Sequence, residues 1–243
     1  MSNSAILRAL FAAFASAALL GCGFVDETPS YRYRMTVEVD TPEGLKTGSS
    51  VIEVATSEGV SSANPAGSVV ISKVRGQAAA VDLSAGRTLF ALLRSEENRD
   101  WAKNIMFILA PEGRKDGDRF LGTYANMLAM REKKELPATL GQYNRALEDF
   151  SGRPMLVTFG DLSDPMSVQR VDPDDLAASF GEGVSLRRIT VQMTDDPVTM
   201  GIEERLKWLT DPAVMESLGW QRLPRDVREV LMGLRAGKVG SER

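Results

Sequence analysis

The regular alternation of residues 31–40 is the sequence feature that most constrains how this chain folds. Apolar and polar side chains take turns along it: Tyr31, Tyr33, Met35, Val37 and Val39 against Arg32, Arg34, Thr36, Glu38 and Asp40. A period of two places the apolar set on one face of a β-strand and the polar set on the other. Strands with one apolar face are typical of antiparallel sheets, so the segment predicts a half-buried strand of such a sheet.

Turn signals and further apolar runs extend this pattern through residues 31–94. Pro42 and Gly44 predict a hairpin turn, with a second strand over residues 51–56. The small and polar residues of 57–67 predict a loop. Three more short strands are expected at residues 69–74, 78–83 and 87–93. The N-terminal part is therefore predicted to be an antiparallel β-meander.

Helical spacing dominates from residue 95 onward. Helices are predicted at residues 98–109, 119–135, 140–150, 202–209, 212–218 and 224–236. For the first of these, a strand over residues 105–110 is the alternative. Apolar and alternating runs predict strands at residues 155–159 and 186–193. The fold class is therefore α+β: a β-rich lobe over residues 31–94 and a mixed lobe with a helical C-terminus over residues 95–243, packed together as one unit.

The N-terminal residues 1–21 have the composition of a targeting segment. A polar start carrying Arg8 is followed by twelve uncharged residues, Ala9–Leu20. A helix of that length spans about 18 Å, less than the ~30 Å of a bilayer core. A basic start, a short apolar middle and small residues at the end are typical of a secretory signal peptide.

The end of this segment resembles the lipobox of bacterial lipoproteins, because it reads Leu19, Leu20, Gly21, Cys22. The resemblance implies a diacylglyceryl thioether on the Cys22 thiol, cleavage between Gly21 and Cys22, and acylation of the new amine, as with palmitate. The alternative is an ordinary signal peptide, cut near residues 15–17, with a buried cysteine.

The lipoprotein resemblance also implies a location. The mature protein would begin at Cys22 and have membrane lipid as its first partner, because several acyl chains form a stable anchor. Gly23, where inner-membrane lipoproteins have Asp, implies the periplasmic face of the outer membrane; a Gram-positive cell surface is the alternative. Residues 22–30 form a short tether, and the eight residues after Cys22 reach at most about 26 to 29 Å.

A second resemblance covers most of the mature chain. Residues 155–209 and the segment TVEVDTPEGLKTGSSVIEV at residues 36–54 are similar to a group of uncharacterised proteobacterial proteins. The resemblance implies a Gram-negative source. It transfers no activity and no active-site residue.

The composition excludes several chemistries. The 243 residues contain no histidine and a single cysteine, Cys22. Ser-His-Asp triads, Cys-His dyads and imidazole metal sites are therefore excluded, and lipidation of Cys22 would remove thiol chemistry as well. Neither of the usual glycine-rich phosphate-binding motifs is present, and we expect no cofactor. The net charge of −4, or −5 once Arg8 is lost, argues against a nucleic-acid partner.

The segment Lys46-Thr47-Gly48 matches one element of the serine penicillin-binding proteins. Those enzymes also need a Ser-x-x-Lys element, which is absent from the chain. We therefore interpret the segment as the exit of the hairpin turn.

Aspartates are the remaining candidates for metal binding or acid–base chemistry. They cluster at Asp161 and Asp164, at Asp172, Asp174 and Asp175, and at Asp195 and Asp196. Four aspartates precede proline: Asp164, Asp172, Asp196 and Asp211. Because an aspartate can cap a helix that starts with proline, Asp172 and Asp211 are predicted to be N-caps. A carboxylate-bound metal is the alternative.

Three tryptophans, Trp101, Trp208 and Trp220, would suit a carbohydrate or peptide platform, but burial in the core is the default for this residue.

Two functions of different classes follow. The first is a non-catalytic binding domain of an envelope lipoprotein, with an envelope protein or a glycan as its partner. The second is a histidine-free envelope hydrolase or transferase that uses carboxylates, for which Asp161, Asp164, Glu203 and Glu204 are the candidates.

Overall fold

The computed structural model describes residues 28–61, 64–83, 86–219, 221 and 223–236. The predicted signal segment 1–21, the residue pair Gly21 and Cys22, most of the tether and Trp220 lie outside the described residues. None of the helices in the described part has the length and apolar character needed to cross a membrane.

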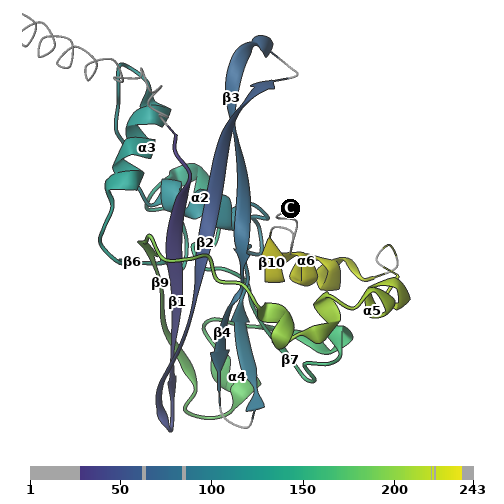
Figure 1. Ribbon diagram of the computed structural model, residues 1–243. Coiled ribbons are helices and arrows are strands. Elements are labelled where there is room, and N and C mark those ends of the chain that lie inside the picture. The colour runs from purple at the N-terminus through teal and green to yellow at the C-terminus, as the bar shows by residue number, and fades with distance from the viewer. Residues whose placement is uncertain (1–27, 62–63, 84–85, 220, 222, 237–243) are drawn as a thin grey trace, which may run out of the picture.

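A six-stranded antiparallel sheet forms the long blade of the molecule (Figure 1). Its strand order is β10-β3-β2-β1-β9-β6. The strands are β1 (Tyr31–Thr41), β2 (Gly44–Ser61), β3 (Asn64–Gln77), β6 (Lys134–Glu135), β9 (Ser185–Met193) and β10 (Arg235–Ala236). The chain therefore builds the centre of this sheet from its first three strands and completes it with segments from far along the sequence.

The alternation of residues 31–40 places the apolar side chains of β1 on a buried face and the polar ones on the other, as predicted. Tyr33, Met35, Val37 and Val39 are fully buried on one face of β1. The other face carries ion pairs, including Arg32 with Glu53 at 2.9 Å, Asp40 with Arg187 at 2.6 Å and Glu38 with Arg188 at 2.9 Å. The prediction of a half-buried strand is therefore confirmed.

The prediction of a loop at residues 57–67 is wrong. β2 continues to Ser61 and β3 begins at Asn64, with Glu58 opposite Val70 and Gly59 opposite Val69. Backbone hydrogen bonds between antiparallel strands do not depend on the side chains, so a stretch rich in small residues can extend a hairpin whose register is already set.

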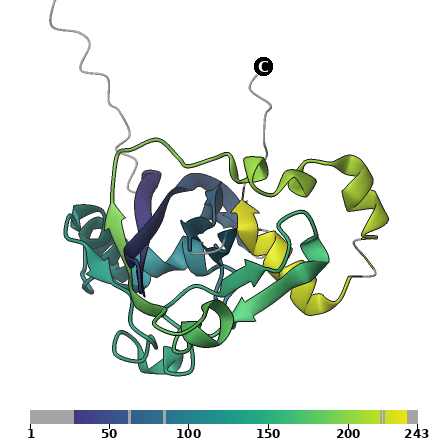
Figure 2. The same ribbon diagram turned by 90° about the horizontal axis from the view of Figure 1, so that it is seen from below.

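A second, four-stranded sheet has the order β4-β5-β7-β8 (Figure 2). It consists of β4 (Ala79–Asp82), β5 (Thr88–Ala91), β7 (Leu156–Phe159) and β8 (Val168–Val171). The predicted meander therefore holds for β1 to β3, whereas β4 and β5 pair with each other in the second sheet.

The second sheet is the middle layer because it is buried on both faces. Leu89 and Ala91 of β5 join the core shared with the first sheet, whereas Phe90 belongs to a second core. That second core lies against α6 (Arg225–Leu234) and the 3₁₀ turns η4 (Ile202–Glu204) and η5 (Lys207–Leu209). The prediction of an α+β fold with a helical C-terminus is confirmed.

Helix α2 (Trp101–Ile108) is attached to the first sheet by tyrosine hydroxyls. Tyr33 donates a hydrogen bond of 2.7 Å to the carbonyl oxygen of Ala102, and Tyr31 donates one of 3.2 Å to that of Lys103. Burial raises the pKa of both tyrosines far above their ordinary value, so both hydroxyls stay protonated and donate. Helix α3 (Arg119–Ala129) packs beside α2.

Three of the predicted α-helices are absent or shorter in the structure. Residues 140–150 contain only the 3₁₀ turn η2 (Arg145–Leu147), and residues 202–209 form two 3₁₀ turns. The helix predicted to reach residue 135 ends at Ala129, because Met130 is extended and the chain turns to form β6. At residues 140–150 and beyond Ala129, a local hydrogen bond or strand pairing overrides a helical spacing of apolar residues. Near η2, for example, the Asn144 side chain accepts from the amide of Ala146.

The two sheets touch most closely where Gly48 of β2 crosses Ala80 of β4. A Cβ atom placed on Gly48 would lie 2.0 Å from the Ala80 carbonyl oxygen and 2.6 Å from its carbon. Both neighbours are backbone atoms, so no side-chain rotation can make room. The residue interpreted as the exit of a hairpin turn therefore lies within β2, at the contact between two sheets.

We expect Gly48→Ala to destabilise the fold by about 1–3 kcal/mol or more, because the added methyl group forces the sheets apart. Urea unfolding measures the change. Gly160→Ala is the matched control, since its Cβ would meet nothing closer than 3.7 Å, and it should be close to neutral. Equal stability of the two variants would contradict the close crossing.

Candidate functional site

The carboxylates proposed for catalysis do not form a site. Asp161 and Asp164 are exposed turn residues. Asp161 accepts hydrogen bonds from the amide and hydroxyl of Ser163, and these bonds lower its pKa below the ordinary value. Asp164 accepts from the amide of Met166 and caps the turn η3 (Pro165–Ser167). A lowered pKa is the opposite of what a general acid needs.

Glu203 and Glu204 lie on η4, and Glu204 is exposed. The Glu203 Oε2 atom lies 3.8 Å from Nη1 of Arg235, and neither atom has a hydrogen-bond partner among the described residues. Glu203 is thus turned toward the start of β10. In the part of the chain that the structure describes, no group of acidic, histidine or cysteine side chains is arranged to hold a metal ion.

The capping interpretation holds for some of the aspartates. Asp211 caps α5 (Pro212–Ser217) as predicted, with bonds from the amides of Ala213 and Val214. The prediction for Asp172 is wrong, because Asp175 caps α4 (Leu176–Phe180). Asp172 instead accepts from the amide of Asp174 in a turn before that helix.

The two described tryptophans are buried and form no platform. Trp101 donates to the carbonyl oxygen of Gly152 at 3.1 Å, and Trp208 donates to that of Leu162 at 2.9 Å.

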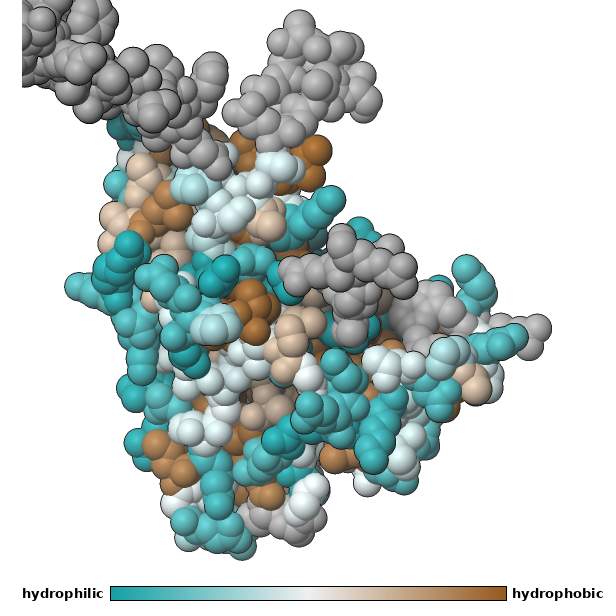
Figure 3. Space-filling model, viewed as in Figure 1, coloured by the Kyte–Doolittle hydropathy of each residue, from teal (hydrophilic) through white to brown (hydrophobic). Residues whose placement is uncertain are grey.

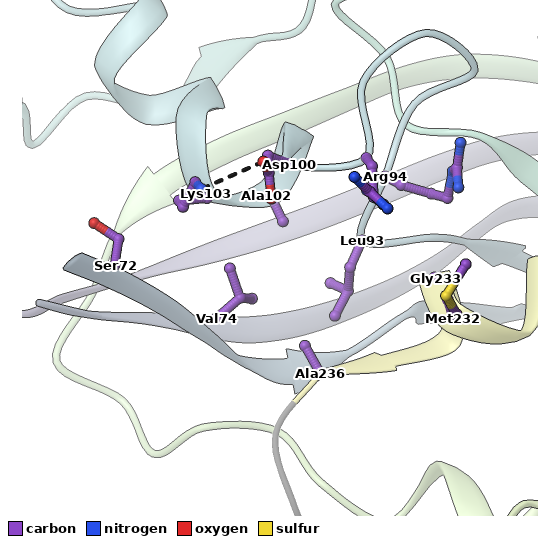
Figure 4. Close-up of a pocket in the computed structure, with 11 residues that line it drawn as sticks. Ser72, Val74, Leu93, Arg94, Asp100, Ala102, Lys103, Met232, Gly233 and Ala236 are labelled. Atoms are coloured by element: carbon purple, nitrogen blue, oxygen red, sulfur yellow. Dashed lines mark ion pairs between the residues drawn. The ribbon is translucent and has the colours of Figure 1, made fainter. Parts of the chain in front are cut away.

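A pocket of about 210 Å³ that carries charged groups lies where β3, α2 and the end of α6 meet (Figure 4). We call it the basic pocket. It is lined by Ser72, Val74, Leu93, Arg94, Arg99, Asp100, Ala102, Lys103, Met232, Gly233 and Ala236.

Arg94 is the buried charged group of the basic pocket. Only 7% of its side chain is exposed, and its Nη2 atom lies 3.4 Å from Oε2 of Glu229. Its Nε atom donates to the carbonyl oxygen of Ser95 at 3.2 Å. A buried guanidinium is costly unless it is paired and hydrogen-bonded, so these contacts hold it in place.

The backbone around Arg94 is fixed by three different elements. The Leu93 amide donates to the Gly233 carbonyl oxygen at 2.8 Å, and the Met155 amide donates to that of Arg94 at 2.8 Å. The Ala102 amide donates to the Leu93 carbonyl oxygen at 3.3 Å. Gly233 allows this approach of α6, since a Cβ atom there would lie 3.0 Å from Cγ of Arg94.

The rest of the lining is basic at the rim and apolar at the floor. Arg99 is exposed, and Lys103 pairs with Asp100 at 3.4 Å (Figure 4). With Arg94, these side chains give the lining three cations and one carboxylate. Glu229 pairs with Arg94, so the cations exceed the two carboxylates by one positive charge, that of Arg99.

The outer edge of β3 runs along the basic pocket and is largely unpaired. β10 pairs only with Gly76 and Gln77 of β3, and among the described residues no other strand pairs with that edge. Ser72 and Val74 line the pocket, whereas the side chains between and beside them, Ile71, Lys73 and Arg75, are exposed. An unpaired strand edge offers backbone donors and acceptors to an added strand.

No protein family, no curated protein and no solved structure matches the chain in the comparisons with known proteins. The site must therefore be judged on its own geometry.

Sequence reasoning missed the basic pocket. Its cations are spread over residues 94–103 with acidic residues between them, so no charged run marks them. The available signal was Arg94 itself, a charged residue directly after the apolar run of residues 89–93 and thus at the end of a predicted buried strand.

Loss of the carboxylate beside Arg94 should destabilise the protein. We expect Glu229→Gln to cost about 3 kcal/mol, because it leaves a buried guanidinium without its charge partner. Thermal or urea unfolding measures the loss. Glu229 also pairs with Arg225, whose side chain is 87% exposed. Arg225→Gln is therefore the control and should change stability by less than about 0.5 kcal/mol. A neutral Glu229→Gln would show that Arg94 is not held in this way.

Proposed function

We propose that this protein is a lipid-anchored protein of the bacterial cell envelope and that its folded part is a non-catalytic binding module. We further propose that the module binds an extended, acidic segment of another envelope protein at the basic pocket and along the edge of β3. The observation that carries the proposal is the unpaired edge of β3 beside the buried Arg94.

An extended segment suits this edge because the backbone of β3 is already extended there and can pair with an added strand. A peptide added there exchanges backbone hydrogen bonds with β3 and places alternate side chains toward one face. On the pocket side these side chains meet Ser72, Val74 and the exposed Met232.

An acidic segment suits the pocket because of the charge of the lining. Arg94 is held by packing and by Glu229 before any ligand binds, and Arg99 and Lys103 lie at the rim. Complementary charge gives specificity and a faster approach of the partner.

The start of the folded part supports an anchor close by. Thr28 is buried, and the carbonyl oxygen of Pro29 accepts a hydrogen bond of 2.8 Å from the Tyr124 hydroxyl. The described part of the structure begins six residues after Cys22, so a lipidated Cys22 would keep the module near the bilayer. On this proposal the bilayer is the outer membrane and the module lies on its periplasmic side.

The alternative, a carboxylate-dependent hydrolase or transferase, gains no support from the geometry. Asp161 and Asp164 bind turn amides, and Glu203 faces Arg235.

Charge reversal at the rim of the basic pocket should selectively weaken the binding of acidic peptides. As a probe we choose a fluorescein-labelled peptide of alternating Glu and Val, with alternating Lys and Val as its counterpart. Fluorescence anisotropy should show that the acidic peptide binds more tightly. Arg99→Glu should weaken it about tenfold, the effect of about 1.4 kcal/mol.

Lys133→Glu is the matched control, because Lys133 is exposed and lies outside the basic pocket. Binding should also weaken as salt is added. Equal binding of the two peptides, or an acidic peptide insensitive to Arg99→Glu, would refute the proposed ligand.

The anchor has a separate test. Mass spectrometry of the mature N-terminus should show an acylated Cys22, and Cys22→Ala should block processing. A wild-type protein with a free Ala or Ser terminus would instead indicate an ordinary signal peptide.

A further inference from the structure

A second hollow, apolar rather than basic, lies between α2, α3 and η2. It has a volume of about 380 Å³, within the range of small-molecule sites. We call it the apolar groove, and its apolar lining consists mainly of Phe107, Ile108, Phe120, Tyr143 and Leu147. Phe120 is 43% exposed and Tyr143 is 39% exposed. Figure 3 shows hydrophobic surface around the end of the molecule where Figure 1 places α3.

Phe120, the more exposed of these two side chains, belongs to a continuous row of aromatic rings. The Phe107 and Phe120 rings stack at 5.3 Å, and the Phe120 and Tyr124 rings lie 5.8 Å apart. Tyr124 in turn meets Tyr31 edge-on at 6.1 Å. Packing within this row fixes Phe120 although much of its surface is in contact with water. The row connects the groove directly to the first residues of β1.

The groove lies close to the point where the chain would leave the membrane. Pro29 is hydrogen-bonded to Tyr124, and Phe120 is one helical turn away on α3, about 6 Å along the axis. Thr28 is six residues after Cys22, a span of at most about 20 to 22 Å. A bilayer that holds Cys22 is therefore within reach of the groove.

Charge at the rim of the groove is balanced. Arg119 is paired with Glu112, and both belong to the lining. With no excess of positive charge to attract anionic lipid, the groove offers a bilayer apolar and aromatic surface.

We propose that the apolar groove is a lipid-docking site: this side of the protein lies on the bilayer, and the groove takes an acyl chain of a membrane lipid, with Phe120 and Tyr143 at the interface. The inference rests on the proposed lipid anchor at Cys22, which supplies the proximity. It adds to that proposal a second, weaker contact that orients the module on the membrane, since apolar surface at the interface strengthens binding in proportion to the area buried.

Photocrosslinking with the whole mature protein tests the site. The processed protein is reconstituted into phosphatidylcholine vesicles containing a phospholipid with a photoactivatable group in its acyl chain, and labelled peptides are mapped by mass spectrometry. Labels should concentrate on residues 107–124 and 143–147. They should persist in about 1 M salt, where the screening length is only about 3 Å.

Phe120→Asp should reduce the labelling about tenfold, since transfer of a large apolar side chain to lipid is worth at least that factor. Met166→Asp is the matched control because Met166 is 45% exposed and lies outside the groove; it should leave the labelling unchanged. Circular dichroism melts of both variants show whether the fold is kept. Equal labelling of wild type and Phe120→Asp, or labels confined to other surfaces, would overturn the inference.

The state of Cys22 is read in the same samples, which separates the two proposals. An acylated Cys22 without labels in the groove would leave the anchor standing and refute the docking site. If Cys22 is not acylated, the anchor proposal fails, and the unmodified chain is then exposed to the same vesicles in excess. Labels in the groove would keep the docking site, and their absence would refute it.

Discussion

The close crossing of Gly48 and Ala80 is the contact on which the arrangement of the two sheets depends. With a hydrogen atom in place of a side chain, β2 lies directly against the backbone of β4, which brings the second sheet close to the first. This packing buries Leu89 and Ala91 of β5 from one side and leaves Phe90 to form a second core on the other. A larger residue at position 48 would separate the layers and affect both cores, because protein interiors are close-packed and transmit strain.

The layering also places the basic pocket. The chain that leaves β5 after Ala91 passes between α2 and α6, and Leu93 is hydrogen-bonded to both. Arg94 therefore emerges into a site already enclosed on two sides, with Glu229 of α6 as its partner. Its charge is retained in a buried position where a hydrophobic side chain would pack at lower cost. Binding of the proposed acidic segment would explain why a charged side chain, Arg94, stands at this buried position.

The periodicity of side chains predicted the strands and helices that have one apolar and one polar face. It failed where backbone hydrogen bonds, rather than a pattern of side chains, determine the secondary structure. The alternation of residues 31–40 and of 186–193 predicted β1 and β9, and the stripe of Val227, Val230 and Leu231 predicted α6. The hairpin extension through residues 57–67 was missed because small residues there carry no pattern. Asp172 was predicted as the cap because it precedes Pro173, but the helix begins at Leu176 and Asp175 accepts the capping bond from the amide of Ala178. The sequence marks Arg94 as a charged residue after an apolar run but does not predict the basic pocket, because the packing of β3, α2 and α6 brings its residues together and no local pattern encodes that packing.

Helix α2 links the two proposed surfaces. Lys103 lines the basic pocket and Phe107, one turn later, lines the apolar groove. The helix has eight residues and so is about 12 Å long. If the groove lies on the bilayer, the pocket and the edge of β3 are at most a few helical turns from the lipid surface. A partner that reaches this edge must then present its extended segment close to the membrane, which favours the juxtamembrane part of another anchored protein over a partner free in the periplasm. Docking of the groove thus restricts the choice of partner at the pocket without any direct contact between the two sites.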